Sequence, residues 1–231
     1  MSNNLLDRVA TPVLIICCVA ITTLSLKQYF FPPAPPTPQI PVQATKGRPL
    51  PDSARIGLGN LRIGPKDAPL QITEFADFEC PFCSVAARQM HELQAKYPAT
   101  ITITFRHFLI GGHAHAPLAA AAAECAADQG AFEKYHSLLF ENYRQLTQKK
   151  IRALAKTAGV TNMGAFDDCV ASNRHEDRIH ADTVAGRMAG VGGTPSWVVG
   201  DSIYGGLLAT SQVEGWAKAL MSKRTTTAFA R

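Results

Sequence analysis

The tetrapeptide Cys80-Pro81-Phe82-Cys83 lies between an apolar run, Leu70 to Phe78, and a helical stretch, Ser84 to Tyr97. A strand that leads directly into a helix places Cys80 at the helix N-terminus, where unpaired amide N–H groups and the helix dipole favour an anion. Pro81 suits the first helical position, because its nitrogen carries no hydrogen and its φ is already helical. Cys83 follows one turn later, facing Cys80. We therefore expect an easily ionised Cys80 thiol and a reversible disulfide, a redox group that needs no cofactor.

A long apolar segment near the start of the chain predicts a membrane anchor. No residue between Arg8 and Lys27 is charged, and the run from Val9 to Leu26 would rise roughly 27 Å as a helix, close to the hydrocarbon thickness of a bilayer. A cleaved signal peptide is the alternative, but the run is longer than a usual signal-peptide core and no clear A-x-A-like cleavage site follows it. We expect residues 1–31 to form an uncleaved single-pass anchor.

Residues 32–53 are rich in proline and predict a linker. Eight of the fifteen prolines of the chain fall between positions 32 and 51. Such a segment cannot build a sheet ladder or a helix, and it extends at about 3.1 Å per residue. We interpret it as a semi-rigid stalk that holds a domain away from a membrane. A proline-rich ligand for a partner protein is the alternative.

The charge and the cysteines narrow the class of function. The formal net charge of +5 comes from scattered basic residues, so nothing indicates a nucleic-acid partner. Cys17 and Cys18 lie within the apolar anchor, where packing is the ordinary role of cysteine and lipidation is the alternative. The other four cysteines follow an export-type segment, which indicates an oxidising compartment.

The rest of the chain predicts one α/β domain, because short alternating strands flank helical patterns on both sides. The expected strands cover residues 70–75, 101–105, 196–199 and 203–204, with a short strand or hairpin within 55–63. The expected helices cover residues 84–97, 116–128, 131–143, 147–158, 163–171, 174–189 and 211–222. Gly130, Gly159 and Gly190 stand at expected helix ends.

A CxxC motif at a strand-to-helix junction, a run of helices and Gly193-Thr194-Pro195 before a β-β-α unit follow one another in this chain. In this combination the chain resembles the DsbA-like branch of the thioredoxin superfamily. The resemblance implies a thioredoxin-like fold over residues 54–223, with a helical insert at about 113–190 and a tail at 224–231. It also implies a protein thiol-disulfide oxidoreductase, since thioredoxin and DsbA are known cases of tuned CxxC thiols.

The resemblance assigns roles to the residues of the cysteine motif and of the Thr-Pro pair. It makes Cys80 the exposed nucleophile and Cys83 the more buried resolving cysteine. Pro195 corresponds to the family's cis-proline, which packs against the disulfide and leaves the Thr194 backbone free to pair with an extended substrate. Pro81 and Phe82 tune the site from between the cysteines. Where the prototype oxidase carries histidine, Phe82 offers neither charge nor donor, which leaves the redox potential open.

Two further assignments follow from the resemblance. Glu74 matches the acidic position beneath the active site, where a buried carboxylate can pass protons to the resolving thiol; an exposed or salt-bridged strand residue is the alternative. Cys125 and Cys169, on two helices of the insert, correspond to a second, structural disulfide of close relatives, with two buried free thiols as the alternative. Such a bridge would add about 4 kcal/mol in the chain-entropy view.

Three other interpretations use the same residues. Cys80 and Cys83 with His113 and His115 would make a zinc set, but their spacing is irregular and Pro81 suits a redox helix, so we expect no metal. A redox-silent anchored domain that binds peptides beside Thr194-Pro195, as a holdase or adaptor, would not need both cysteines. A reductase or isomerase would use the same active site, because a sequence does not set a reduction potential.

We predict a membrane-anchored oxidase that gives disulfides to unfolded or partly folded exported proteins with cysteines. The anchor would lie in the inner (cytoplasmic) membrane, with the catalytic domain on the extracytoplasmic, periplasmic side, where disulfides persist. The resemblance also implies a quinone-linked membrane partner, of the DsbB or vitamin K epoxide reductase type, that reoxidises Cys80 and Cys83.

Overall fold

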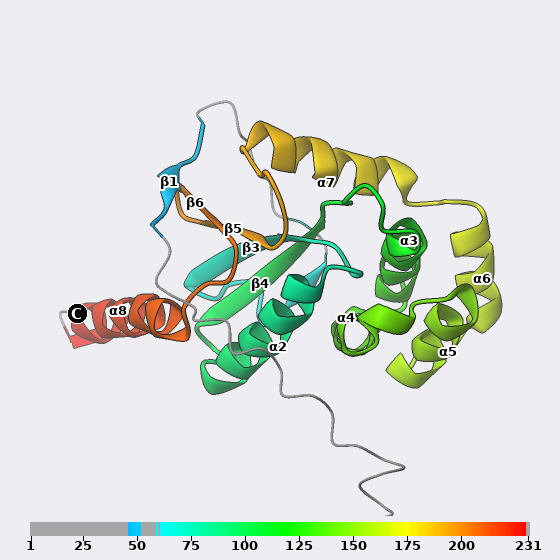
Figure 1. Cartoon of the computed structure of the whole chain (residues 1–231). Helices are drawn as coiled ribbons and strands as arrows, with labels where there is room; N and C mark the ends of the chain where they lie inside the picture. The colour runs from blue at the N-terminus through cyan, green and yellow to red at the C-terminus, as the bar shows by residue number, and fades with distance from the viewer. Residues whose placement is uncertain (1–45, 52–58, 60, 230–231) are drawn as a thin grey trace, which may run out of the picture. The chain divides into compact units, whose positions relative to one another are not determined.

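The computed structural model describes residues 46–51, 59 and 61–229 (Figure 1). The predicted anchor and most of the predicted linker lie outside these residues. Within the described part, no helix combines the length and the apolar character that a membrane span needs. The described part is an α/β domain with a helical insert, which confirms this part of the predicted fold class.

One mixed sheet of six strands organises the described residues, in the order β1-β6-β5-β3-β4-β2. The strands are β1 (Arg48–Pro49), β2 (Arg62–Ile63), β3 (Leu70–Ala76), β4 (Ile101–His107), β5 (Ser196–Val199) and β6 (Ser202–Gly205). Strand β3 pairs parallel with β4 on one side and antiparallel with β5 on the other. The strand that leads into the CxxC motif is therefore central, with neighbours along both edges.

Some helices cover the sheet, and others form a group beside it. The helices are α2 (Pro81–Lys96), α3 (Ala116–Ala127), α4 (Phe132–Glu141), α5 (Gln148–Ala158), α6 (Met163–Ala171), α7 (Glu176–Met188) and α8 (Thr210–Phe229), with a 3₁₀ turn, η1 (Tyr143–Gln145). Helices α3 to α6 gather beside the sheet, whereas α2 lies on the strands (Figure 1). The insert thus adds a helical layer next to a β-α-β and a β-β-α half.

Alternation along β3 separates two hydrophobic clusters, one on each face of the sheet. Ile72 and Ala76 pack in the cluster that contains the buried side of α2. Phe75, which points the other way, packs with Phe108 and Val191 in the second cluster. Helix α7 approaches this second face closely, since a Cβ added at Gly186 would lie 2.7 Å from the Phe108 ring. Glu74 shares the Ile72 face and so lies under α2.

The predicted boundaries differ from the structure mainly at the two ends of the domain. Arg48 and Pro49, within the predicted 32–53 linker, form the edge strand β1, paired with Ser202 and Ile203. A proline is tolerated there because an edge strand leaves one row of N–H groups unused. Helix α8 runs on to Phe229, into the predicted 224–231 tail, since no glycine or proline after Gly215 stops it.

Candidate active site

Cys80 stands at the junction between β3 and α2. Its backbone is extended, with φ −75° and ψ 121°, and it precedes Pro81, the first residue of α2. The amide of Ser84 donates to the Cys80 carbonyl at 3.2 Å, the first bond of the helix. The Cys80 side chain therefore projects from the helix N-terminus, as the sequence predicts.

The surroundings of Cys80 favour its thiolate. A hydrogen bond from the Cys83 side chain lowers the pKa of Cys80 most, and it outweighs burial, which raises that pKa. The Thr194 side chain and the backbone amides of Cys83 and Phe82 stabilise the anion further, and the pKa of Cys80 falls from 9.0 to about 6. At neutral pH Cys80 is therefore largely ionised, the state in which a thiol attacks a disulfide.

Cys83 has the opposite character. Its side chain is buried, and both cysteines are free thiols in this structure. Burial raises the pKa of Cys83 far above its ordinary value, and the charges of Cys80 and Glu74 raise it further. The Cys80 thiol is thus ready to react, whereas the Cys83 thiol stays protonated until a base removes its proton.

Cys80 is more exposed than Cys83 but less exposed than the resemblance implies. Cys80 is 6% exposed and Cys83 is fully covered, so the predicted order holds while the predicted exposed nucleophile is mostly covered. The reason is the loop before β5: the Thr194 carbonyl lies 3.5 Å from the Cys80 sulfur and accepts a hydrogen bond from the thiol. The peptide bond between Thr194 and Pro195 is cis.

Glu74 is a buried acid on the central strand, beneath α2. It pairs in register with Phe105 of β4 and Trp197 of β5, and none of it is exposed. Neither carboxylate oxygen has a hydrogen-bond partner. Burial raises the pKa of Glu74 to about 8, and the nearby Cys80 charge adds to the effect. The exposed or salt-bridged alternative for Glu74 is therefore wrong, because both faces of the sheet are covered.

Phe82, His113 and His115 are the other residues near the two cysteines in the sequence-based interpretations. Phe82 is 49% exposed beside Cys80. His113 Nδ1 lies 3.0 Å from Asp77 Oδ1, and His115 Nδ1 lies 3.1 Å from Glu79 Oε1. The described residues contain two sets of potential metal ligands. Within each set the ligand atoms lie within 4.8 Å of one another, and neither set includes these histidines. In the structure these two histidines are therefore paired with acidic side chains.

Asp77 and Glu79 are site residues that the sequence analysis missed. The Glu79 carboxylate accepts hydrogen bonds from the amides of His115 and Ala116, at 2.6 and 2.8 Å, at the start of α3. Asp77 accepts from the Ile110 amide at 2.9 Å. These acids connect the chain just before Cys80 to the loop that begins the insert. The sequence signal that could have identified them is the presence of two acidic residues between an apolar strand and a CxxC motif.

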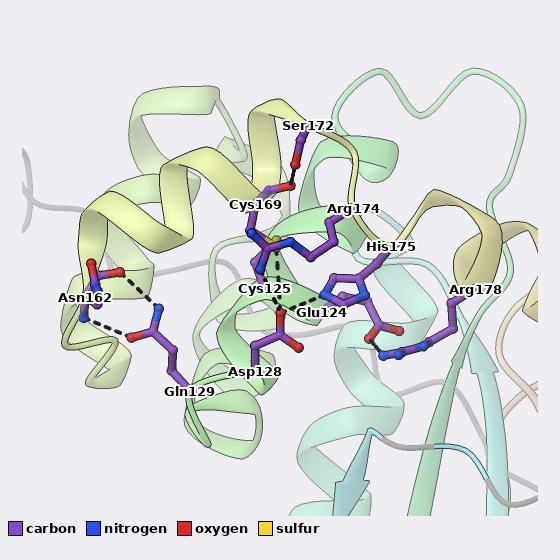
Figure 2. Close-up of a disulfide and its surroundings, with 10 residues drawn as sticks. All are labelled: Glu124, Cys125, Asp128, Gln129, Asn162, Cys169, Ser172, Arg174, His175 and Arg178. Atoms are coloured by element: carbon purple, nitrogen blue, oxygen red, sulfur yellow. Dashed lines mark hydrogen bonds and ion pairs between the residues drawn. A yellow bond between two sulfur atoms is a disulfide. The ribbon is translucent and has the colours of Figure 1, made fainter.

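A disulfide joins two helices of the insert (Figure 2). Cys125 of α3 is bonded to Cys169 of α6, with Cα atoms 5.9 Å apart. Asp128, His175 and Arg174 surround the bond: Asp128 Oδ2 lies 2.8 Å from His175 Nε2 and 3.6 Å from Arg174 Nη1. The pair that the resemblance implied is thus bonded in the structure, within a polar shell.

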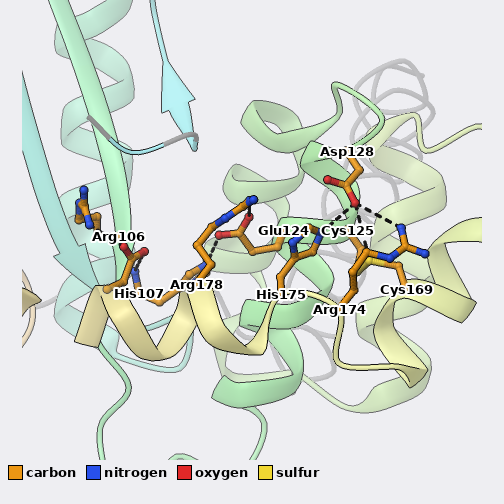
Figure 3. A network of polar contacts seen from close by, with 10 residues as sticks. Arg106, His107, Glu124, Cys125, Asp128, Cys169, Arg174, His175 and Arg178 are labelled. Carbon is orange, nitrogen blue, oxygen red and sulfur yellow. Dashed lines mark hydrogen bonds and ion pairs between the residues drawn. A yellow bond between two sulfur atoms is a disulfide. The ribbon is translucent and has the colours of Figure 1, made fainter. Parts of the chain in front are cut away.

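A buried network of charges ties α7 to α3 and β4 (Figure 3). Arg178 Nη1 of α7 lies 2.6 Å from Glu124 Oε2 of α3, and Glu124 is not exposed at all. Arg106 Nη1 of β4 lies 2.7 Å from Asp182 Oδ1 of α7. Burial raises the pKa of Glu124, but the neighbouring His107 and Arg178 outweigh it and lower that pKa overall. The network holds the insert against the sheet.

Residues 58–219, more than half of the chain, match a family described as thioredoxin. The matched range contains both cysteines of the CxxC motif, Glu74 and Pro195.

Several solved structures share the fold of the described domain. BdbD from Bacillus subtilis superposes with a TM-score of 0.63 and 17% identity, over 78% of this chain and 100% of that one. The thiol-disulfide exchange protein α-DsbA2 from Wolbachia pipientis gives 0.62 and 22%, over 69% and 86%. The catalytic domain of Proteus mirabilis ScsC gives 0.60 and 24%, over 70% and 88%. At these identities the likeness shows a shared fold.

Curated relatives in sequence are much longer proteins. The Na(+)/H(+) antiporter NhaA 3 of Salinispora tropica is 34% identical over 160 residues, which cover 69% of this chain and 24% of the antiporter. The antiporter NhaA 1 of Mycolicibacterium vanbaalenii is 36% identical over 126 residues, covering 54% of this chain and 19% of that protein. The chain spans about a quarter or less of the length of these relatives. The antiporter activity in their names belongs to those whole proteins.

Proposed function

The chain belongs to the thioredoxin family, and we propose that it is a DsbA-like thiol-disulfide oxidoreductase that donates disulfides to exported proteins. The observation that supports this direction is the contrast between the two thiols of the CxxC motif. The pKa of Cys80 is lowered to about 6, whereas burial raises that of Cys83. A stable Cys80 thiolate stabilises the reduced form, and a stable reduced form makes the Cys80–Cys83 disulfide oxidising.

The proposed reaction has two exchange steps. A substrate thiolate attacks the Cys80 sulfur, a mixed disulfide forms, and the bond to Cys83 breaks with its electron pair on the Cys83 sulfur. Cys83 takes up a proton as it leaves, because its buried site disfavours the anion. A second thiolate of the substrate then attacks the substrate sulfur of the mixed disulfide, and Cys80 departs as a thiolate. The substrate gains one disulfide, and the enzyme leaves as a dithiol.

We assign Glu74 to the transfer of the Cys83 proton. Its pKa of about 8 keeps it protonated near neutral pH. When Glu74 is ionised, its charge raises the pKa of Cys83, so the two groups lie close enough to interact. A carboxylic acid with a pKa near the working pH can give a proton and take it back. The absence of any hydrogen-bond partner for its two oxygens leaves both free to bind a proton.

Thr194 is proposed to bind the substrate backbone. It precedes β5, and its carbonyl lies 3.5 Å from the Cys80 sulfur. An extended peptide that adds beside this segment would make main-chain hydrogen bonds, which tolerate many side chains. This suits an enzyme that acts on varied unfolded or partly folded proteins.

The location and the partner are part of the same proposal. The apolar run Val9 to Leu26 and the proline-rich residues after it support an inner-membrane anchor with the domain on the periplasmic side. The bonded Cys125 and Cys169 suit an oxidising compartment. A quinone-linked membrane protein of the DsbB or vitamin K epoxide reductase type would reoxidise Cys80 and Cys83.

The reduction potential of the Cys80/Cys83 couple tests the direction. The full chain in detergent is equilibrated with glutathione buffers, and the reduced fraction is read by alkylation and mass spectrometry. A disulfide donor should have a potential above about −200 mV, toward the values of isomerases and of DsbA. A potential at or below about −270 mV, that of thioredoxin, would make the protein a reductase. Failure of the pair to exchange would favour the peptide-binding alternative.

A further inference from the structure

The disulfide of the insert lies among further metal-binding side chains. One donor atom each of Cys125, Cys169 and His175 lies within 4.8 Å of the other two. Asp128 adds a carboxylate oxygen, 3.8 Å from the Cys169 sulfur and 2.8 Å from His175 Nε2. We propose that these four residues form a zinc site when the Cys125–Cys169 disulfide is reduced. This proposal is independent of the exchange chemistry at Cys80.

The four donors match what zinc prefers. Zinc in structural sites takes four ligands from thiolate sulfur, imidazole nitrogen and carboxylate oxygen, at about 2.0 to 2.3 Å. Ligand atoms around a tetrahedral zinc therefore lie about 3.3 to 3.8 Å apart. The separation of 3.8 Å between Asp128 Oδ2 and the Cys169 sulfur lies at the edge of this range. The hydrogen-bonded pair of Asp128 Oδ2 and His175 Nε2, at 2.8 Å, has to move about 0.5 Å apart to bind zinc. The two sulfurs are bonded here and have to move apart, which reduction allows.

The position of the four residues also suits a structural site. Asp128 and Cys125 lie one turn apart at the end of α3, Cys169 lies in α6, and His175 precedes α7. Both cysteines are buried, and the His175 side chain is 10% exposed. Asp128, at 38% exposure, faces solvent and offers an entry path. Figure 2 shows these side chains converging on the disulfide from three segments.

The charges of the site balance around a zinc ion. Two thiolates and one carboxylate carry three negative charges, and zinc compensates for two of them. Arg174 supplies the remaining positive charge, since its Nη1 lies 3.6 Å from Asp128 Oδ2. A ligand set close to neutrality is held in a partly buried position at little electrostatic cost.

The other set of potential ligands in the described residues lacks this balance. His107, Glu124 and Asp182 also bring donor atoms within 4.8 Å of one another. Glu124 is already paired with Arg178 at 2.6 Å (Figure 3), and Asp182 is paired with Arg106 at 2.7 Å. A cation would have to displace two guanidinium groups there. We therefore assign to that set the structural role of holding α7 against α3 and β4.

Electrons and protons balance in the change from the disulfide to the zinc-bound dithiolate. A dithiol reductant gives two electrons to the Cys125–Cys169 bond, the two sulfurs take up two protons, and the reductant leaves as a disulfide. Zinc then displaces both thiol protons and accepts electron pairs from His175 and Asp128. An oxidising disulfide reverses the process: it takes two electrons from the thiolates, the sulfur–sulfur bond forms again, and zinc is released. The helices α3 and α6 are thus cross-linked in both states.

Cobalt absorption tests the site. The full chain in detergent, with Cys80 and Cys83 replaced by serine, is reduced with a dithiol that is then removed under argon, and Co²⁺ is titrated in. We expect one equivalent to bind with the intense bands of tetrahedral, thiolate-bound cobalt, and Zn²⁺ to displace it. The oxidised protein should not show these bands. Absence of tetrahedral bands in the reduced protein would overturn the proposal.

Two ligand variants and a matched control locate the ion. His175→Ala and Asp128→Asn should each weaken Co²⁺ binding at least tenfold, since each removes a ligand, and loss of even an outer partner costs about 10-fold or more. His180→Ala, which changes another histidine nearby in α7, should leave the affinity unchanged. Equal affinity in the His175 and His180 variants would show that the ion binds at other thiols, against the proposal.

Thermal unfolding gives a second measure that does not depend on cobalt. Zn²⁺ should raise the unfolding temperature of the reduced protein and of reduced His180→Ala, because an ion that binds only the folded state stabilises it. It should not raise that of reduced His175→Ala or of the oxidised protein. If the reduced chain unfolds and Zn²⁺ does not restore it, the proposal is wrong.

Discussion

The carbonyl oxygen of Thr194 lies 3.5 Å from the sulfur of Cys80, although 114 residues separate the two in the chain. The contact joins the two halves of the domain at the helix start, where the thiolate is stabilised. A peptide that pairs with the backbone before β5 would therefore bring its own sulfur to Cys80. Substrate binding and nucleophilic chemistry share one small region.

The two cysteines should differ in what they trap. Cys83→Ser leaves Cys80 able to attack a substrate disulfide but removes the thiol that resolves the product, so long-lived mixed disulfides should accumulate. Cys80→Ser should abolish exchange, because Cys83 is buried and protonated. Non-reducing gels and mass spectrometry of captured proteins provide the measurement. Trapping by the Cys80 variant and none by the Cys83 variant would reverse the two roles.

The reactivity of Cys80 should follow its lowered pKa. Its alkylation by iodoacetamide should reach half of its maximal rate near pH 6, since the pKa of Cys80 is about 6 rather than 9.0. Because the unfolded chain holds this proton up to a higher pH, the reduced protein should gain stability from this group as the pH rises from about 6 to 9, and lose it as the pH falls through 6. A half-maximum near pH 9 would contradict the stabilised thiolate.

Glu74 should contribute a pH dependence of the opposite sign. Its pKa is about 8 in the folded protein against an ordinary 4.5, so the unfolded chain loses this proton first and stability falls as the pH rises between these values. Glu74→Gln should therefore be more stable than the wild type at pH 8, on the order of a few kcal/mol, and similar at pH 4. Urea unfolding at both pH values measures this.

An exposed acid provides the control for that comparison. Asp67→Asn changes a carboxylate on the surface and should leave the pH dependence of stability as it is. If Glu74→Gln and Asp67→Asn behave alike, the buried Glu74 carboxyl ionises in the folded protein as it does in water.

Phe82→His should make the protein a stronger oxidant. Phe82 is 49% exposed, so the change leaves the core intact. A histidine there can donate a hydrogen bond to the Cys80 thiolate and stabilise the reduced form. A charge-assisted hydrogen bond of about 1.5 to 3 kcal/mol corresponds to a rise of some tens of millivolts. Both the Cys80 pKa and the glutathione equilibrium should move; if neither does, the side chain at position 82 points away from the sulfur.

Arg178→Ala should destabilise the insert. It removes the partner of Glu124, whose carboxylate is fully buried, and leaving such a group unpaired costs about 1 to 3 kcal/mol or more. Arg187→Ala removes an exposed arginine of the same helix and should cost less than about 0.5 kcal/mol. Urea midpoints compare the two. Equal midpoints would mean that water or His107 satisfies Glu124 without Arg178.

Patterns within short stretches of the sequence determined most of the helices and strands. The CxxC motif at a strand-to-helix junction, the order of the helices and the glycines at their ends all depend on local backbone geometry. Gly130, Gly159 and Gly190 have φ values of 72°, 105° and 82°, left-handed conformations that glycine adopts without a steric cost. Periods of 2 and 3.6 residues are legible in a sequence, because they repeat within one element.

The environment of single side chains was decided by the tertiary structure. The position of Glu74 in β3 was clear from the sequence, but its burial depends on α2, β4 and β5 closing over it. The pairs of Glu124 with Arg178 and of Glu79 with His115 join residues 54 and 36 positions apart. No local period encodes such pairs. They depend on how helices and strands pack, and the same packing sets the pKa values and the convergence of His175 and Asp128 on the disulfide.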